Sequence, residues 1–577
     1  KTHKESYRLA NTLTYRNSFN KSHNVNVMLG QEINHAQNDN TFMSAKLFPV
    51  SVTAEAALEN FALGTPNQST SYKSAPDRTA SFFGRALYDY KNRYYATLTV
   101  RADGSTKFAP GKQWGYFPAG SIAWRISNEK WMKPIKFISD LKLRASYGLA
   151  GNNRIGNDLW HNIYRVYSGT SAPAFGNEEY NYYQFADQTY LYDPDLKWET
   201  TITRNIGLDF GFFRNRLSGT VDVYWNTTKD LLVPSIIPNS SGYSRQMTNV
   251  GQTSNKGVEI SLDAKIIQTK DFQLSANFNV AFNKNKVDKL ATGETEWKTK
   301  ASLSNWYGTY NYKMEVGKSM GLIYGFVNDG FYKVDDFDFD ATTKKWTLKP
   351  GIPDNSSFSS GNFAFKPGAM KFKKLSDSES NLITEDDMTV IGDTNPKVTG
   401  GFGLSGNWKN LDFTAFFNYM CDFDVLNVNK LYLHSAVRRN YSNLSTDMNL
   451  ANRFRYVDDA GVNVSSDPVA LAALNENAKT YSWMSVTQGI TMIDLVEDGS
   501  FLRLSTLTVG YTLPKHWLRS LGVKSLRLYF SGSNLFTITG YSGYDPEVNI
   551  QKGLTPGIDN NVTPRSRVYT VGVNLNF

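Results

Sequence analysis

Tyr569-Thr570-Val571-Gly572-Val573-Asn574-Leu575-Asn576-Phe577, the last nine residues of the chain, alternate between two kinds of side chain. The odd-numbered positions are aromatic or aliphatic, and the even-numbered positions are small or polar. Because successive side chains of a β-strand point to opposite faces, this pattern predicts a strand with one apolar and one polar face. The beginning of the chain repeats the pattern, with an apolar face made of Tyr7, Leu9, Leu13, Tyr15 and Phe19.

The same alternation recurs along the whole chain and predicts fifteen long strands. They span residues 5–19, 24–36, 78–90, 93–104, 114–127, 140–150, 197–212, 216–232, 252–266, 271–286, 397–409, 411–424, 498–513, 523–535 and 569–577. Short turns such as 91–92 and 213–215 alternate with loops that are mostly long: 37–77, 151–196, 233–251, 287–396, 425–497 and 536–564. A transmembrane antiparallel β-barrel explains this alternation, because its periplasmic turns are short and its extracellular loops are long.

The composition supports an all-β chain. Aromatic residues make up 14% of the 577 residues and charged residues only 20%, which argues against disorder. No run of 18 apolar residues is present, so the sequence has no candidate transmembrane helix. The single cysteine, Cys421, excludes an intrachain disulfide framework and a thiolate metal cage. The net charge of +9 is not gathered in a basic block, and this indicates a solvated surface rather than a nucleic-acid site.

The predicted number of strands bears on whether the barrel closes. An open sheet edge is costly in lipid, and bacterial single-chain barrels have an even number of strands. Fifteen is odd, and if the C-terminus is periplasmic, the strand at residues 5–19 lacks a partner. We therefore expect residues 1–577 to be the C-terminal part of a larger barrel.

Ten short motifs resemble one family. They are RADGSTKF (101–108), WGYFPA (114–119), LKLRASYG (141–148), LKWETT (196–201), IGLDF (206–210), NKGVE (255–259), FLRL (501–504), GYTLP (510–514), SNLF (533–536) and YSGYDPE (541–547). In combination they resemble the SusC/RagA family, the TonB-dependent outer-membrane transporters of the Bacteroidetes. The resemblance extends from about residue 78 to the end of the chain.

The resemblance implies a 22-stranded barrel in the bacterial outer membrane, surrounded by lipid and lipopolysaccharide. A plug domain and a TonB-contacting segment would precede the strands found here. In this family a SusD-like lipoprotein caps the barrel and delivers oligosaccharide or, in some members, peptide. The TonB–ExbB–ExbD complex then pulls on the plug, using the proton gradient of the inner membrane. Neither a cofactor nor nucleic acid is implied.

Two other classes of function share part of this sequence pattern. A passive porin or an adhesin barrel would share the strands but would need no plug. A barrel-borne enzyme would need a nucleophile and a base at one rim. The sequence has no H-E-x-x-H, G-x-S-x-G or P-loop motif and only six histidines, so we expect no enzyme.

The candidate substrate-contacting residues are aromatics of the long loops, namely Trp160, Trp306, Tyr307 and Trp483. An aromatic ring offers an apolar platform with a polar edge, which suits a sugar or a peptide. Each ring could instead pack inside its own loop.

Two further groups of residues are candidate sites. Asp336, Asp338 and Asp340 have the alternating spacing that begins a calcium loop, but Ala341 and Thr347 stand where the turn glycine and the bidentate glutamate belong. We therefore expect a solvated acidic loop and no metal. Tyr569 and Phe577 resemble the terminal aromatic signal read by the outer-membrane assembly machinery, although Phe577 could also serve as an interfacial anchor.

Overall fold

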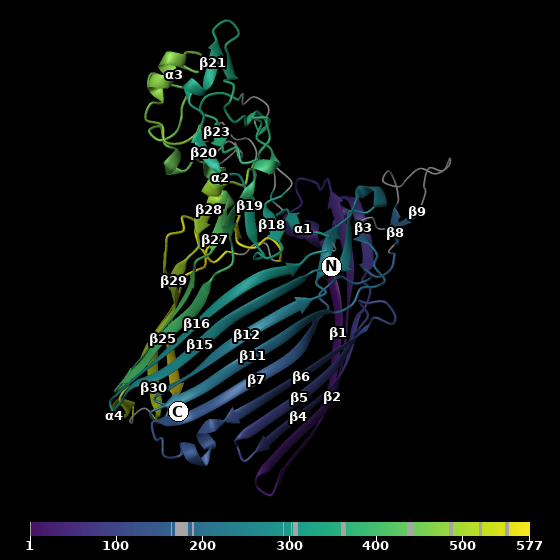
Figure 1. The fold of residues 1–577 in the computed structure, drawn as a ribbon, viewed down its shortest axis with the longest axis vertical. Coiled ribbons are helices and arrows are strands. Elements are labelled where there is room, and N and C mark those ends of the chain that lie inside the picture. The colour runs from purple at the N-terminus through teal and green to yellow at the C-terminus, as the bar shows by residue number, and fades with distance from the viewer. Residues whose placement is uncertain are drawn as a thin grey trace. The chain divides into compact units, whose positions relative to one another are not determined.

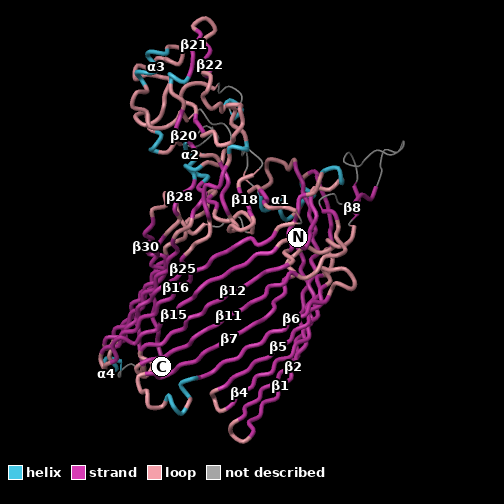
Figure 2. Tube along the Cα trace, in the orientation of Figure 1, coloured by secondary structure: helices cyan, strands magenta, loops and turns pink. Residues whose placement is uncertain are grey.

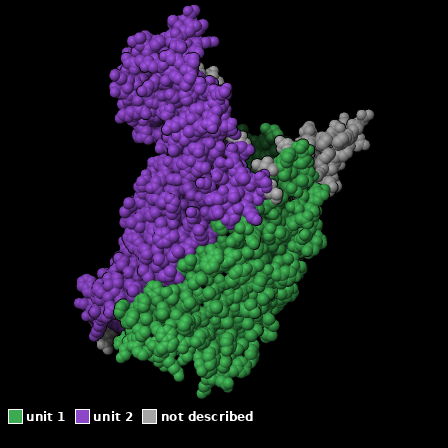
Figure 3. Space-filling view, viewed as in Figure 1, with its two compact units in different colours: residues 1–215, 222–254 green, residues 216–221, 255–577 purple. Residues whose placement is uncertain are grey.

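The computed structural model describes residues 2–162, 164–167, 183–186, 190–291, 293–301, 303, 310–358, 365–434, 443–483, 489–518, 522–548 and 553–577. The chain divides into two compact units (Figure 3). The first contains residues 1–215 and 222–254, and the second contains residues 216–221 and 255–577. Among the described residues, no helix is long and apolar enough to cross a lipid bilayer.

The first unit is built on long antiparallel strands that lie side by side in chain order (Figure 1). They are β1 (Thr2–Phe19), β2 (His23–Lys46), β4 (Asp77–Tyr90), β5 (Tyr94–Ser105), β6 (Trp114–Arg125), β7 (Ile138–Asn152), β11 (Glu199–Phe212) and most of β12 (Leu217–Lys229). β3 (Thr65–Lys73) pairs with β2. The shorter elements are α1 (Ala54–Glu59), β8 (Tyr164–Tyr167), β9 (Tyr183–Ala186), β10 (Tyr190–Leu191), β13 (Leu232–Ile236) and β14 (Arg245–Asn249).

The second unit contains a further run of neighbouring antiparallel strands. They are most of β15 (Gln252–Gln268), β16 (Phe272–Lys289), β25 (Val398–Trp408), β26 (Leu411–Cys421), β29 (Phe501–Thr512), β30 (Ser525–Thr539) and β32 (Val568–Asn576).

The long loops of the second unit carry many short elements, which Figure 2 shows as brief magenta and cyan segments. They are β17 (Glu296–Thr299), β18 (Tyr312–Glu315), β19 (Leu322–Gly325), β20 (Asn328–Phe331), β21 (Phe337–Asp340), β22 (Lys345–Leu348), β23 (Met370–Phe372), β24 (Thr389–Asp393), β27 (Asp424–Asn427), α2 (Val428–His434), α3 (Pro468–Leu474), β28 (Val496–Asp498) and β31 (Ile558–Asp559). α4 (Lys515–Leu518) lies instead in the short connection between β29 and β30.

All fifteen predicted strands are confirmed, most within a few residues of their predicted bounds. The prediction was wrong for part of the 37–77 loop. There β2 continues to Lys46 and pairs with β3, from Asp39↔Lys73 to Lys46↔Thr65. Polar residues fill most of both strands, so this hairpin has no apolar face by which the sequence could have revealed it.

The short turns close by left-handed backbone conformations. Lys91 and Asn92 have φ values of 54° and 52°, and Asn20 and Lys21 have values of 50° and 55°. Two consecutive left-handed residues form the tight turn whose twist matches that of the flanking strands. Because the strands are antiparallel and their connections alternate between short and long, the short turns of the first unit lie at one end of the strands and the long loops leave from the other end.

Candidate functional site

One face of the strands in the first unit is apolar and open. Along β5 and β6 the side chains of Leu98, Val100, Tyr116 and Ile122 are 59%, 46%, 68% and 67% exposed. Leu98 pairs with Gly120 and Val100 with Pro118, and directly paired residues share a face. So large an exposed apolar surface requires an apolar environment. We call this surface the apolar face.

The opposite face, the polar face, carries paired charges. The Arg144 guanidinium lies between two carboxylates, 2.8 Å from Asp209 and 3.1 Å from Asp222. A Cβ atom at Gly207 would meet the Arg144 and Asp222 side chains within 2.7 Å, so a glycine there leaves room for the guanidinium. Polar and charged groups are retained where they face water or each other, and a water-filled barrel interior is such a place.

Other ion pairs and hydrogen bonds repeat this arrangement along the polar face. Arg101 contacts Asp103 at 2.8 Å and Ser81 at 3.0 Å, and Arg125 contacts Asp140 at 3.0 Å. Sequence reasoning predicted a polar face but did not single out these residues. Charged side chains at alternate positions inside a predicted strand are the signal that would have identified them.

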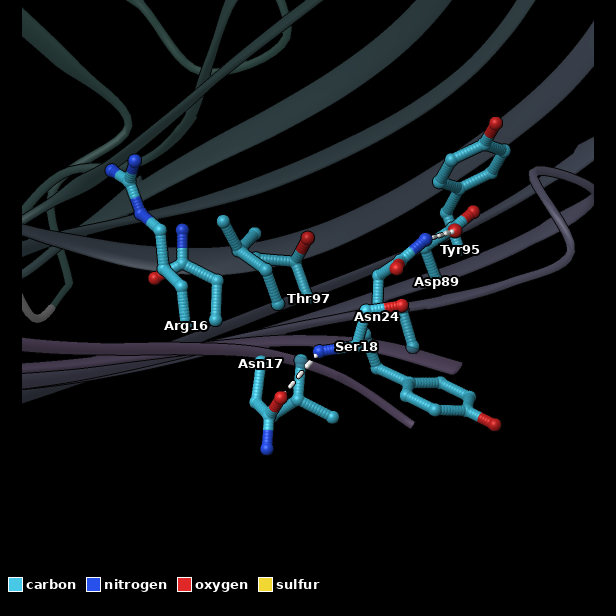
Figure 4. Close-up of a pocket in the computed structure, with 12 residues that line it drawn as sticks. Arg16, Asn17, Ser18, Asn24, Asp89, Tyr95 and Thr97 are labelled. Carbon is cyan, nitrogen blue, oxygen red and sulfur yellow. Dashed lines mark hydrogen bonds between the residues drawn. The ribbon is translucent and has the colours of Figure 1, made fainter. Parts of the chain in front are cut away.

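A depression of about 570 Å³ lies on β1, β2, β4 and β5 near the short turns (Figure 4). Its polar lining includes Arg16, Asn24, Asp89, Tyr95 and Thr97. The Asn24 side-chain amide donates to Asp89 at 2.6 Å. Hydroxyl, amide, carboxylate and guanidinium groups together can bind a polar solute or a polar protein surface.

Three of the motifs that carry the family resemblance meet in one buried cluster. Phe108 is fully buried, and the Trp198 ring lies 5.4 Å from the Phe108 ring and 5.5 Å from the Phe117 ring. The Trp198 indole donates to the Gln113 carbonyl at 2.9 Å. A Cβ atom at Gly151 would lie 2.0 Å from the Phe117 ring, so only a glycine fits beside it. These motif residues therefore hold loops to strands rather than contact a ligand.

The long loops of the second unit build a hydrophobic core of their own, which the sequence did not predict. We call the part of these loops around this core the head. Tyr312, Ile323, Leu426, Leu431 and Ile558 are at most 1% exposed within it. They come from three different loops. The Tyr312 hydroxyl donates to the Pro556 carbonyl at 2.5 Å, and β27 pairs in parallel with β31. The head is consequently a packed structure.

A cavity of about 270 Å³ opens on the head. Its aromatic lining is Phe331 and Phe454, whose rings lie 5.8 Å apart, and Lys333, Asp335 and Glu476 are exposed at its edge. Two aromatic rings beside charged groups of both signs can contact an amphipathic solute. Sequence reasoning missed this cavity, because its residues come from two loops more than a hundred positions apart.

A buried carboxylate fixes one loop of the head. Asp387 is fully buried and accepts hydrogen bonds from the backbone N–H groups of Leu375, Ser376 and Thr384 at 2.8–2.9 Å and from the Lys374 ammonium at 3.1 Å. Burial by itself would raise the pKa of Asp387, but these four donors outweigh it and lower the pKa to about 2.

Asp387→Asn should lower the free energy of unfolding of the head by about 2 kcal/mol at pH 7, which corresponds to the shift from 3.8 to about 2. A depressed pKa stabilises the fold above about pH 4, and this contribution disappears as the pH falls to about 2. Thermal unfolding of parent and variant at pH 7 and at pH 2 checks this expectation. An equal difference in stability between parent and variant at pH 7 and at pH 2 would contradict it.

The predicted aromatic residues do not form one site. Trp160 belongs to the first unit, is partly buried and lies 4.4 Å from the His161 ring. Trp483 belongs to the second unit and packs against the core of the head. Trp306 and Tyr307 lie outside the described residues. A substrate-binding role for these four residues remains a prediction.

The three carboxylates of the calcium candidate do not converge. Asp336 accepts from the Lys333 backbone N–H at 2.9 Å, and Asp340 accepts from the N–H groups of Thr342 and Thr343. Asp338 is exposed on β21. In the part of the chain that the structure describes, no three acidic, histidine or cysteine side chains gather as metal ligands.

Tyr569 and Phe577 lie on the same face of the last strand and are 62% and 74% exposed. The Tyr569 ring stacks on that of Phe530 at 6.2 Å. Between them Val571 and Val573 are 82% and 59% exposed, so the strand does carry the predicted apolar face. The role of the two aromatics in assembly remains a prediction.

Long antiparallel strands with an exposed apolar face, a polar face of ion pairs, short turns at one end and long loops at the other define the wall of an outer-membrane β-barrel. The family model "TonB dependent receptor-like, beta-barrel" matches residues 2–535. The chain belongs to this family of TonB-dependent receptors, as the resemblance implied.

Individual relatives agree with this assignment. The chain is 32% identical over 573 residues to TonB-dependent receptor P3 of Formosa agariphila, covering 98% of this chain and 52% of the relative. It is 31% identical over 509 residues to TonB-dependent receptor SusC of Bacteroides thetaiotaomicron, covering 86% and 43%. Among solved structures, the RagAB peptide transporter matches with a TM-score of 0.73 and 26% identity, covering 100% of this chain and 56% of that chain. The chain thus spans about half the length of these relatives.

Proposed function

We propose that the chain forms barrel wall and loops of an energised importer in the bacterial outer membrane. Oligosaccharides or peptides would enter from the side of the long loops, delivered by a SusD-like lipoprotein. A plug in the remaining half of the receptor would open when the TonB–ExbB–ExbD complex pulls on it. The strands themselves would break no bond, in keeping with a family of receptors rather than enzymes.

The polar face is the observation that carries this proposal. Several of its charges are paired, as Arg144 is with Asp209 and Asp222, and a paired charge binds a passing solute less tightly than a free one. The apolar face supports the membrane location, because exposed Leu, Val and aromatic side chains need lipid around them. The cavity that Phe331 and Phe454 help to line supports contact of the loops with an amphipathic solute.

Of the three proteins named above, the RagAB peptide transporter carries a substrate in its name. SusC carries no substrate in its name, and it is slightly more similar to this chain in sequence. We therefore keep both oligosaccharide and peptide within the proposal.

Deleting the gene should abolish growth on one class of nutrient and leave growth on free glucose and amino acids unchanged. The reason is that oligosaccharides and peptides of more than a few units are too large to diffuse in without a dedicated barrel. The measurement is growth of the deletion strain and its parent on defined glycans and on defined peptides. Restored growth with the parent gene, but not with a copy lacking its TonB-contacting segment, separates energised import from a passive porin.

A further inference from the structure

The turn between β6 and β7 presents an unusual surface. Residues 126–137, which we call the basic turn, contain the exposed side chains of Lys130, Trp131, Lys133, Lys136 and Phe137. Trp131 is 60% exposed and Phe137 is 53% exposed. Ordinary periplasmic turns are short and polar, so a twelve-residue turn that displays bulky rings between lysines calls for an explanation.

The basic turn is held firmly in place. The Glu129 carboxylate is buried and accepts from the Tyr94 hydroxyl at 2.7 Å, the Trp124 indole at 3.1 Å and the Arg93 guanidinium at 3.2 Å. The Met132 side chain is 6% exposed and anchors the centre of the turn. The lysines and rings therefore extend from a fixed backbone.

An aromatic surface continues from the basic turn to the neighbouring turn. The Phe137 ring lies 6.1 Å from that of Phe212 and 6.5 Å from that of Phe213, and Phe213 is 59% exposed. The Phe213 backbone N–H donates to the Phe137 carbonyl at 2.7 Å, which joins the two turns. Glu129 of the basic turn also contacts the stacked rings of Tyr94 and Trp124, which lie at the end of the apolar face. Aromatic side chains favour this depth, at the boundary between hydrocarbon and water.

The charges of this surface are not neutralised by the protein. Lys130, Lys133, Lys136 and the adjacent Arg214 form no ion pair among the described residues. The single acidic residue of the basic turn, Glu129, is directed inward and is already bound. The other short turns of the first unit carry Lys21 and Lys91. This end of the first unit thus offers several free cations beside exposed rings.

We propose that the basic turn binds anionic phospholipid headgroups of the leaflet that borders the short turns. The phosphates would contact Lys130, Lys133 and Lys136, while Trp131, Phe137 and Phe213 would insert at the level of the ester groups. Charge complementarity selects an anionic lipid, and the exposed rings select a membrane rather than a soluble polyanion. The inference rests on the outer-membrane location in the proposed function, but not on import.

The test uses the full-length transporter purified in detergent. Bound lipids are counted by native mass spectrometry while phosphatidylglycerol or phosphatidylethanolamine with the same acyl chains is added. The variant is K130Q/K133Q/K136Q. The matched control is K46Q/K73Q/R154Q, which removes three exposed basic residues from the long-loop side of the same unit. Heat-modifiable migration shows whether each protein is folded.

The parent should prefer phosphatidylglycerol, and this preference should weaken with added salt. The basic-turn variant should bind phosphatidylglycerol about tenfold or more weakly, while the control should match the parent.

Three results would each overturn the proposal: equal affinity of variant and parent, an equal loss of affinity in the control, or a parent without lipid preference. Tighter binding of purified lipopolysaccharide through the same lysines would also overturn it, because that lipid occupies the opposite leaflet. Should the variant fail to fold, the lipid preference and salt dependence of the parent still decide. None of these readouts requires uptake, so failure of import would be recognised separately.

Discussion

Asp545→Ala should cost about 3–5 kcal/mol of stability in the last long loop of the second unit. The Arg503 side chain is 2% exposed, and its guanidinium contacts the Asp545 carboxylate at 2.5 Å and the Glu547 carboxylate at 3.6 Å. Without Asp545, the buried Arg503 guanidinium keeps only the more distant Glu547 carboxylate, which also binds Arg565 at 2.6 Å, and a poorly compensated charge is costly in a medium of low dielectric constant. The loop should then detach from β29, which carries Arg503.

The exposed pair of Lys397 and Asp422 provides a matched control. These two side chains are 67% and 61% exposed and lie 2.7 Å apart, so Lys397→Ala should cost no more than about 1 kcal/mol. The measurements are thermal unfolding and proteolysis of the 540–567 loop in parent and both variants. The double variant R503M/D545L should recover much of the loss, because it removes both charges together. Equal effects of the two alanine variants would show that burial does not set the strength of the Arg503 pair.

The Arg503–Asp545 pair also shows what the sequence could and could not predict. Both residues belong to motifs that carry the family resemblance, FLRL and YSGYDPE. Nothing in either motif indicates that they meet across 42 positions. The strands, in contrast, were predictable one by one, because the alternation of Leu98 and Val100 with Thr97 and Thr99 is visible within five residues.

The head was beyond prediction for the same reason. Its core joins Tyr312 to Pro556 and Asn311 to Thr491, pairs that are 244 and 180 positions apart. Its strands are two to five residues long, too short for a period to be recognised. Individual aromatic residues could therefore be proposed as ligand contacts, but the Phe331–Phe454 cavity required the assembled loops.

Leu98→Arg should prevent assembly of a large fraction of the protein, whereas Thr97→Arg should be tolerated. The two residues are neighbours on β5, but they point to opposite faces. Leu98 lies near the middle of the apolar face, between Ala86 and Gly120, and an arginine at the midplane of the bilayer costs about 2–4 kcal/mol. Thr97 lies between Leu87 and Ser121 on the polar face, where an added cation meets water and should change stability by no more than about 0.5 kcal/mol.

Heat-modifiable migration after refolding into lipid vesicles, followed over a urea titration, measures both variants against the parent. Because the two changes add the same charged side chain at adjacent positions of one strand, net charge cannot explain a difference between them. The difference reports the environment of each face alone. If Thr97→Arg were the more damaging change, the polar face would be the one in contact with lipid, and the ion pairs of Arg144 and Arg125 would need a different explanation.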